Sequence, residues 1–183
     1  MKKVSILVST IDSGGAEKQA VLLAIQLSKH TDVNLIVLYG GHTEYKGNVD
    51  LLAKSSVKVH RLNGSMLLKT IRIRELLKES HTDVLLNYLT MPDFLGSFLG
   101  KRLRISVYNG IRNSRLPKSK MLMEKWAHNY WATGTIYNCY SGADYFGQLG
   151  FRKDKNIVIP NCFPDIAEPI IRDRYSQKTI ITV

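Results

Sequence analysis

Short apolar runs and helix-like segments alternate along the chain from its first residues. Residues 4–9, Val-Ser-Ile-Leu-Val-Ser, are nearly unbroken in hydrophobicity and rich in β-branched side chains, which is typical of a strand buried on both faces. Over 21–27 the apolar residues instead recur at helical spacing, with polar residues at the other positions. The pattern therefore predicts a strand, a loop and a helix over 16–29.

The same alternation continues to the end of the chain, with short loops between the elements. Further strands are expected at 34–39, 57–62, 83–88, 104–108, 134–138 and 155–159. Helices are expected at 48–54, 66–79, 92–99, 118–130 and 141–150. Strands that alternate with helices in this way are parallel and joined by right-handed crossovers. We therefore expect an α/β fold, a doubly wound and mainly parallel Rossmann-like sheet with helices on both faces.

Local signals describe the ends and faces of several helices. Ser65 is placed to cap helix 66–79, and Pro92 and Ser141 mark the starts of two later helices. Helix 66–79 carries an apolar stripe made of Leu67, Leu68, Ile71, Leu76 and Leu77. The aromatic residues of helix 118–130 are interpreted as core packing rather than a stacking platform for bases. They are Trp126, Tyr130 and Trp131.

The last apolar run, 178–183, has no helix after it. We interpret it as the first strand of a further, missing C-terminal domain. The polar stretch 164–177 is then an interdomain linker, and residues 1–163 form the N-terminal domain.

Length and composition indicate a globular protein with one domain of ordinary size. The chain has 183 residues, of which 44% are hydrophobic and 22% charged. No apolar run approaches the roughly 18–20 residues of a membrane span, and the N-terminus lacks the features of a signal peptide. We therefore expect a cytoplasmic protein in which Cys139 and Cys162 are free thiols.

Positive charge is concentrated in one part of the chain. The formal net charge is +11, and residues 101–125 hold eight basic residues against the single acid Glu124. The basic residues are Lys101, Arg102, Arg104, Arg112, Arg115, Lys118, Lys120 and Lys125. This excess indicates an anionic partner: nucleic acid, anionic lipid or a phosphorylated substrate. A merely solvated face is the alternative.

The loop between the first strand and the first helix ends in two glycines, Gly14 and Gly15. Glycines leave the backbone open to close approach by another molecule, and the free N–H groups of a first helical turn attract an anion. The turn is therefore a candidate site for a phosphate-bearing ligand. The alternative is a tight turn that needs glycine only for its backbone angles.

Familiar cofactor and catalytic motifs do not occur in the sequence. The dinucleotide motif G-x-G-x-x-G and the phosphate loop G-x-x-x-x-G-K-[ST] are missing after the first strand. H-E-x-x-H, C-x-x-C and G-x-S-x-G are also missing. The sequence thus disfavours a nicotinamide enzyme, a P-loop ATPase, a zinc peptidase, a thiol oxidoreductase and an α/β-hydrolase, and we expect no metal site.

Four short segments follow one another in a recognisable order and together span nearly the whole chain. They are 14–19 (Gly-Gly-Ala-Glu-Lys-Gln), 106–113 (Ser-Val-Tyr-Asn-Gly-Ile-Arg-Asn), 131–151 and 155–161 (Lys-Asn-Ile-Val-Ile-Pro-Asn). As an ordered set they resemble the N-terminal domain of glycosyltransferase family 4, whose members are retaining enzymes of the GT-B fold.

The resemblance implies two Rossmann-like domains that face each other across a cleft. The N-terminal one mainly binds the acceptor, and the C-terminal one mainly binds the nucleotide-sugar donor, a co-substrate; no other cofactor is implied. In the family the glycine turn approaches the donor diphosphate or sugar. We therefore assign Gly14, Gly15 and Glu17 to donor or phosphate binding, where the helix start would stabilise a leaving phosphate.

The chain departs from the family pattern in two places. Many relatives carry a histidine after the fifth strand, where this chain has Asn109, Arg112 and Asn113. We expect these three residues to contact the acceptor or a phosphate; for Arg112 the alternative is a loop arginine of the basic segment. After the seventh strand, Cys162 and Phe163 stand where Gly-Ile is usual.

The family's C-terminal domain carries two glutamates eight positions apart that hold the donor. No two glutamates of this chain have that separation; they are Glu17, Glu44, Glu75, Glu79, Glu124 and Glu168. The catalytic residues are therefore expected outside the chain, which should not transfer sugar alone.

The leading hypothesis is the acceptor-side half of a retaining hexosyltransferase. It would move sugar from a nucleotide-sugar to a cell-surface polysaccharide or glycolipid precursor, peripherally at the inner face of the plasma membrane. A basic patch and helix 66–79 would hold it against anionic lipid. The patch consists of Lys101, Arg102, Arg115, Lys118 and Lys120.

Three other functions remain open from the sequence. A basic nucleic-acid-binding domain fits the charge, but no nucleic-acid partner is expected because the basic residues do not interleave with aromatic ones. A sugar-nucleotide epimerase of the same two-domain shape would differ in the absent half. A non-catalytic binding module would apply if the natural protein ended near Val183.

Overall fold

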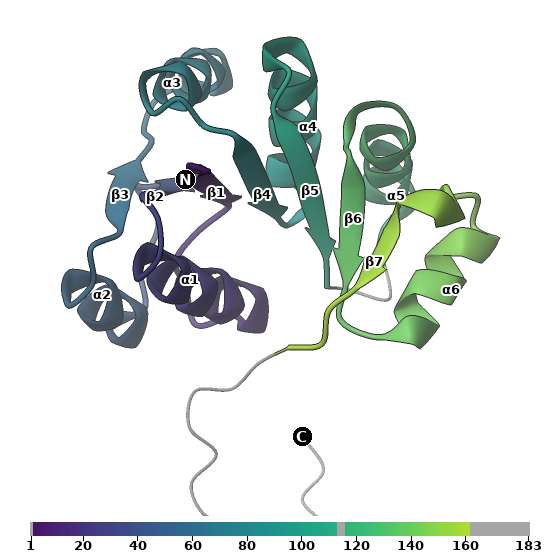
Figure 1. Cartoon of the computed structure of the whole chain (residues 1–183), viewed down its shortest axis with the longest axis horizontal. Coiled ribbons are helices and arrows are strands. Elements are labelled where there is room, and N and C mark those ends of the chain that lie inside the picture. Colours follow the sequence, from purple (N-terminus) through teal and green to yellow (C-terminus); the bar gives the residue numbers. More distant parts are fainter. Residues whose placement is uncertain (1, 113–115, 162–183) are drawn as a thin grey trace, which may run out of the picture.

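A computed structural model describes residues 2–112 and 116–161 of the chain. Within these residues a single seven-stranded sheet runs through the molecule in the order β3-β2-β1-β4-β5-β6-β7 (Figure 1). All neighbouring strands are parallel. The strands are β1 (Val4–Val8), β2 (Val33–Val37), β3 (Lys58–Arg61), β4 (Val84–Tyr88), β5 (Ser106–Ile111), β6 (Gly134–Tyr137) and β7 (Asn156–Val158).

Helices cover both faces of the sheet. They are α1 (Gly15–Ser28), α2 (Lys46–Ala53), α3 (Met66–Glu79), α4 (Thr90–Leu103), α5 (Lys118–Trp126) and α6 (Tyr140–Gln148). α1 and α2 pack on one face, and α3 and α4 pack on the other. Every step from β4 to β7 runs in the same direction, so right-handed crossovers place α5 and α6 in the layer of α4. The expected doubly wound, Rossmann-like α/β fold is confirmed.

Alternation along each strand divides the core into two layers. In β1, Ile6 and Val8 pack toward α1, whereas Leu7 packs toward α3 and α4. All three side chains are at most 1% exposed. A strand buried on both faces explains why the sequence of β1 is continuously apolar.

Two glycines let α4 lie close to the sheet. A Cβ on Gly96 would lie 2.1 Å from Oδ1 of Asn87 in β4, and a Cβ on Gly100 would lie 2.1 Å from Cγ2 of Val107 in β5. Both distances are impossible for a real side chain. The spacing of four residues therefore gives α4 a bare face exactly where it crosses β4 and β5.

Some predicted helix boundaries are confirmed and others are wrong. Helix α3 spans the predicted 66–79, and the Ser65 hydroxyl accepts the Leu68 N–H. Helix α4 begins at Thr90, ahead of Pro92, because Leu89 takes the cap position. Ser141 is not the cap of α6, since it lies inside a helix that begins at Tyr140.

Two predicted apolar clusters are only partly buried. In α3, Leu76 and Leu77 are buried, but Leu67 is 71% exposed and Leu68 59% exposed. The interpretation of the aromatic cluster as core packing is wrong for two of its members, which face solvent at the end of α5 and in the turn after it. These are Trp126, 51% exposed, and Tyr130, 64% exposed.

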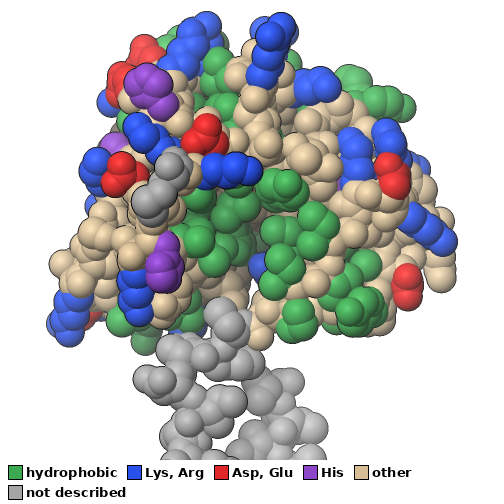
Figure 2. Space-filling model, in the orientation of Figure 1, with side chains coloured by type: hydrophobic (Ala, Val, Ile, Leu, Met, Phe, Trp, Pro, Cys, Tyr) green, Lys and Arg blue, Asp and Glu red, His purple; other side chains and the backbone are tan. Residues whose placement is uncertain are grey.

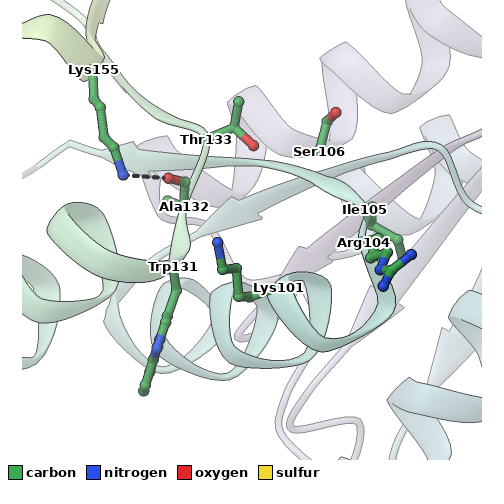
Figure 3. Close-up of a pocket in the computed structure, with 8 residues that line it drawn as sticks. All are labelled: Lys101, Arg104, Ile105, Ser106, Trp131, Ala132, Thr133 and Lys155. Atoms are coloured by element: carbon green, nitrogen blue, oxygen red, sulfur yellow. Dashed lines mark hydrogen bonds between the residues drawn. The ribbon is translucent and has the colours of Figure 1, made fainter.

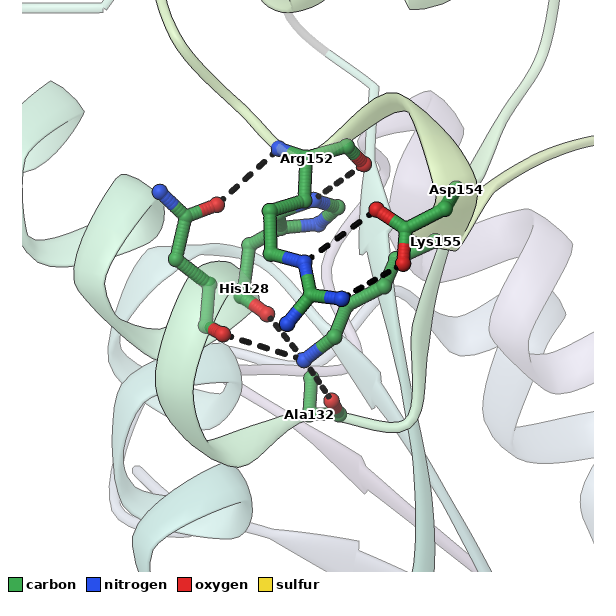
Figure 4. A network of polar contacts seen from close by, with 6 residues as sticks. His128, Ala132, Arg152, Asp154 and Lys155 are labelled. Atoms are coloured by element: carbon green, nitrogen blue, oxygen red, sulfur yellow. Dashed lines mark hydrogen bonds and ion pairs between the residues drawn. The ribbon is translucent and has the colours of Figure 1, made fainter.

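A polar network around His128 stabilises the β6–β7 side of the sheet (Figure 4). After α5 the chain makes a π-helical turn, Ala127–Trp131. Lys155 donates hydrogen bonds to two carbonyl groups of this turn and to the carbonyl group of Ala132, which follows it. The His128 ring lies between the Thr135 hydroxyl, at 2.7 Å, and the Arg152 carbonyl oxygen, at 3.0 Å. A carbonyl only accepts, so Nε2 carries a hydrogen. Burial lowers the pKa of His128 to about 4, so the ring is neutral at neutral pH.

Several predictions concern residues outside the described ranges. The linker 164–177, the strand 178–183, Asn113, Arg115, Cys162 and Phe163 belong to this group. The division into domains therefore stays a prediction. Among the described residues, no helix is long and apolar enough to cross a membrane.

Candidate functional site

The order of the strands places a crevice at one edge of the sheet. From β1 the chain moves outward to β2, and from β4 it moves outward to β5 in the opposite direction (Figure 1). The loops after β1 and β4 therefore leave on opposite faces, and ligands of doubly wound proteins bind at the carboxyl ends of two such strands. In Figure 2 the visible face is hollowed near its middle, with apolar side chains around the hollow and most Lys and Arg side chains toward the periphery.

The glycine turn lies at this crevice, after β1. Gly14 has φ −62° and ψ 150°, which any residue adopts. Gly15 is the first residue of α1, and a Cβ there would meet nothing within 4 Å. Neither glycine is needed for its backbone angles, so the tight-turn explanation does not account for them. What the two glycines provide is a bare surface over the start of α1.

Glu17 covers part of that surface. A Cβ on Gly14 would lie 2.2 Å from Oε2 of Glu17, so the carboxylate lies directly over Gly14. The Thr10 hydroxyl donates to Oε1 of Glu17 at 3.4 Å. The free N–H groups of the first turn thus already face a negative charge within the chain. A phosphate bound at this turn would have to displace the Glu17 carboxylate.

The loop before the turn is fixed by contacts that the sequence did not reveal. Ile11 is fully buried. Its carbonyl oxygen accepts from the Tyr45 N–H, and the Asn48 side chain donates to the Asp12 carbonyl oxygen at 2.8 Å. Asn48, in α2, is only 2% exposed. In the sequence, the only sign of this contact is that Asn48 is a polar residue at an inward-facing position of α2.

The backbone is strained at the other side of the crevice. Leu89, between β4 and α4, has φ 77° and ψ 155°. A side chain at positive φ costs roughly 1–3 kcal/mol and persists where the surroundings impose it, often beside a functional site.

Arg112 joins three strand ends at this edge. Its guanidinium lies 5.4 Å from the ring centroid of Tyr88, the last residue of β4. It also donates to the side-chain oxygen of Asn161, beyond β7. Arg112 itself follows β5 and is half-buried. Its position leaves a cation at the mouth of the crevice.

A small pocket of about 220 Å³ adjoins Arg112. It is lined by Ile111, Arg112, Tyr137, Asn138, Cys139, Gly142 and Phe146. Cys139 caps α6 and is an exposed free thiol. Hydrogen bonds from the Ser141 hydroxyl and the Gly142 N–H lower the pKa of Cys139.

Asn109 lies beneath this edge rather than on it. Its side chain is fully buried and accepts hydrogen bonds from Asn87, in β4, and Ser97, in α4, both at 2.9 Å. Of the three residues expected after the fifth strand, the structure thus brings Arg112 to the crevice and buries Asn109; Asn113 is not described.

Two acids lie in the same buried polar layer. Asp93, in α4, is fully buried, and Glu124, in α5, is 2% exposed. Their carboxyl groups hydrogen bond to each other. Burial raises the pKa of Glu124 to about 7. Burial and the neighbouring Glu124 raise the pKa of Asp93 well above its ordinary value, whereas the Gly110 N–H and the nearby Arg112 act in the opposite direction.

The predicted basic patch is split between the two edges of the sheet. Lys101 and Arg102 are exposed in the last turn of α4, whereas Lys118 and Lys120 are exposed in the first turn of α5. Helices antiparallel to the strands place these two turns at opposite edges. Arg115 is not described.

A larger cavity, of about 560 Å³, lies at the amino-terminal edge, opposite the glycine turn (Figure 3). Its basic side chains are Lys101, Arg104 and Lys155. Lys155 points to the Ala132 carbonyl oxygen, 2.8 Å away, and is therefore engaged within the protein. Among the described residues, no three His, Cys, Asp or Glu side chains come together in a way that could hold a metal ion.

Part of the chain is similar in sequence to a known glycosyltransferase. No family model matches the chain. A Campylobacter jejuni protein described as GalNAc-alpha-(1->4)-GalNAc-alpha-(1->3)-diNAcBac-PP-undecaprenol alpha-1,4-N-acetyl-D-galactosaminyltransferase is 33% identical over 95 residues. The match takes in 49% of this chain and 26% of that protein.

The fold is shared with several solved structures, including the following two. Anabaena HepE in complex with UDP-glucose matches with a TM-score of 0.74 at 17% identity, over 89% of this chain and 44% of that one. UDP-N-acetylglucosamine 2-epimerase from Rickettsia bellii matches with a TM-score of 0.61 at 15% identity, over 88% of this chain and 45% of that one. The chain therefore has the Rossmann-like fold of GT-B proteins and spans less than half the length of these three proteins.

Proposed function

We propose that the chain is the acceptor-side domain of a retaining glycosyltransferase that moves a hexose from a nucleotide-sugar to a glycolipid or polysaccharide precursor. The observation that carries the proposal is the bare glycine turn at the β1 and β4 carboxyl ends, where neither glycine is required by its backbone angles. The Campylobacter relative, whose name describes a lipid-diphosphate-linked acceptor, supports the reaction class.

The glycine turn would receive the donor diphosphate. Negative charge builds up on the phosphate as the sugar leaves, and the N–H groups at the start of α1 are oriented to stabilise it. The Glu17 carboxylate lies over Gly14, so its side chain would occupy the phosphate position in the free protein and move away when the donor binds. The remainder of the donor site and the catalytic residues would belong to a second domain.

Arg112 would bind a phosphate or a sugar hydroxyl from the acceptor side. The Tyr88 ring supports the guanidinium from one side, and one guanidinium nitrogen donates to Asn161. A ligand phosphate or hydroxyl would take the place of Asn161 as the acceptor. The adjoining pocket of about 220 Å³ is large enough for a phosphate or part of a sugar ring.

Epimerisation of a nucleotide-sugar is the second candidate, because the Rickettsia bellii epimerase shares the fold with a TM-score of 0.61. The two reactions differ in their need for an acceptor. A transferase releases nucleoside diphosphate only when the acceptor is present and extends that acceptor, whereas an epimerase changes the sugar without one.

The test is an assay of the natural protein at its full length with UDP-sugars and lipid-diphosphate-linked acceptors. Acceptor-dependent release of UDP, together with a product that keeps the anomeric configuration of the donor, would support the proposal. Inversion at the anomeric carbon would remove the retaining mechanism. Acceptor-independent conversion of the sugar would identify an epimerase instead.

A further inference from the structure

The outward face of α5 and of the π-helical turn after it carries large apolar side chains in a row. Leu122, Trp126 and Tyr130 follow one another at intervals of four residues and are 69%, 51% and 64% exposed. With Lys125 and Asn129 they line a shallow trough of about 340 Å³. Exposed apolar residues that stand singly need no explanation, but a contiguous row marks an interaction surface.

Aromatic contacts extend this row toward the end of α4. The Trp126 ring lies 5.2 Å from that of Trp131, which lies 5.3 Å from Phe98 in α4. The Arg102 guanidinium stacks on Phe98, 4.4 Å from its centroid. We name Leu122, Trp126, Tyr130 and Trp131 the aromatic band. Its rings support one another, so the band is a preformed surface rather than a set of loose side chains.

The charges on the two helices that carry and flank the aromatic band are mainly positive, and the nearby Asp154 is paired with Arg152. Lys118 and Lys120 are exposed at the start of α5, and Lys101 and Arg102 are exposed at the end of α4. Glu124 is the only acid of α5, and it points into the core at 2% exposure. The outward face of α5 therefore presents apolar and cationic groups without a carboxylate.

We propose that the aromatic band docks this protein on the surface of an anionic lipid bilayer. Indole and phenol side chains favour the membrane interface because an apolar ring there carries a polar group that stays hydrated. An amphipathic helix with lysines beside its apolar face lies in the interface plane, and each basic residue near anionic lipid adds to the attraction. The docking concerns the partner of the proposed function, since it would bring the enzyme to a lipid-linked acceptor.

Charge favours a bilayer over a second copy of the chain. A symmetric dimer would place the same patch of each copy against the other, and the lysines and arginine around the band would then face cations of equal sign. Such like-charge contacts oppose association. An anionic bilayer instead complements the lysines and the arginine at the two ends of the band.

The position of the tryptophans gives a direct test. The chain has two tryptophans, Trp126 and Trp131, and both belong to the aromatic band. The full chain is mixed with vesicles of phosphatidylcholine, with and without phosphatidylglycerol. The expected result is a blue shift of tryptophan emission, and quenching by brominated acyl chains, on the anionic vesicles alone, with binding that weakens as salt rises.

Matched variants distinguish vesicle binding through the aromatic band from nonspecific adsorption of the protein to vesicles. Leu122→Ser combined with Tyr130→Ser keeps both tryptophans and should weaken vesicle binding by at least about tenfold. Leu51→Ser removes a 43% exposed leucine from α2, on the other face of the sheet, and should leave binding unchanged. Far-ultraviolet circular dichroism checks that each variant is folded.

Two results would overturn the inference. One is vesicle binding that the double variant leaves intact or that does not change the tryptophan emission. The other is a blue shift that grows with protein concentration in the absence of lipid, which would assign the band to a second copy. Both readouts are independent of sugar transfer, so loss of the proposed activity would leave this test standing.

Discussion

The carboxyl groups of Asp93 and Glu124 hydrogen bond to each other inside the protein, between α4 and α5. Two carboxylates cannot share a buried contact unless at least one carries a proton. The pair therefore holds a proton at neutral pH. It lies beside the Gly110 N–H and near Arg112, so its charge acts directly beneath the crevice.

This pair makes the folded state less stable as the pH rises. The pKa of Glu124 is about 7, against an ordinary value of 4.5, so between these values the folded protein keeps a proton that the unfolded chain has released. The Glu124 contribution to the free energy of unfolding should fall across that window, by up to roughly 3 kcal/mol. Glu124→Gln keeps a hydrogen-bond donor to Asp93 without a titrating proton and should remove this contribution, whereas the contribution of the buried Asp93 remains. Urea denaturation at a series of pH values measures the difference.

The control for this variant is Glu75→Gln, because Glu75 is a surface acid paired with Arg72. Its profile should follow that of the unmodified chain. Parallel profiles for Glu124→Gln and the unmodified chain would mean that Glu124 is ionised in the folded state at mildly acidic pH.

His128 contributes the opposite dependence over nearly the same pH range, so the two contributions oppose each other in the unmodified chain. Its pKa is lowered to about 4, so the unfolded chain binds a proton below about 6.5 that the folded protein does not bind. The His128 contribution to the free energy of unfolding should be complete above about 6.5 and fall by up to roughly 3 kcal/mol as the pH decreases to 4. His128→Gln should be less stable at neutral pH, and its difference from the unmodified chain should shrink as the pH falls through this window. Thermal unfolding at fixed ionic strength compares the two.

His42, which is exposed, offers the matched control, His42→Gln. This substitution should leave the dependence of the stability on pH below about 6.5 unchanged. The His128 ring can also be followed by NMR in the folded chain. A midpoint near 6.5 for that ring would contradict the buried, neutral histidine of Figure 4.

The sheet could be predicted from the sequence because its signal is local. The apolar strands and the helical spacing of 66–79 depend on the side chains of each segment alone. Burial of a helix face depends on what packs against it, and this explains the error at Trp126 and Tyr130. Their spacing was read as a core stripe, but α5 has only its opposite side against the sheet, where Glu124 lies.

The candidate site was partly predictable for the same reason. Gly14 and Gly15 end the loop after β1, and Arg112 follows β5 directly. The carboxyl ends of parallel strands meet at one edge. Asn48 and Leu89 support this edge through a tertiary hydrogen bond and a strained backbone angle. Neither effect leaves a periodic pattern in the sequence. Asn109 lies only three residues before Arg112, yet the pleat of β5 turns it toward α4.

Arg112 can be tested as a ligand-binding residue. Arg112→Ala should weaken binding of the sugar substrates to the full-length natural protein by about 10- to 100-fold, because a charge-assisted contact is lost. Arg112→Lys should restore little, since an ammonium group does not stack on Tyr88 or present a planar pair of donors. Titration calorimetry gives the affinities.

Arg152→Ala removes an equal charge from an exposed pair with Asp154 and serves as the control for general electrostatics. Its affinity for the same ligands should be unchanged. If both substitutions weakened ligand binding equally, Arg112 would act only through the general positive charge of the protein and not through a direct contact.

Gly15→Ala separates the two explanations of the glycine turn. The site has open space and a helical backbone, so alanine should raise the free energy of unfolding by about 0.4–1 kcal/mol through the unfolded state. If a donor phosphate approaches this backbone, the same methyl group should weaken nucleotide-sugar binding to the full-length protein by at least about tenfold. Gly147→Ala, in the last turn of α6 beside the flexible Lys153 chain, should not affect binding. A destabilised Gly15→Ala variant would favour the tight-turn explanation. A stabilised variant with unchanged affinity for the nucleotide-sugar would contradict phosphate binding at this turn.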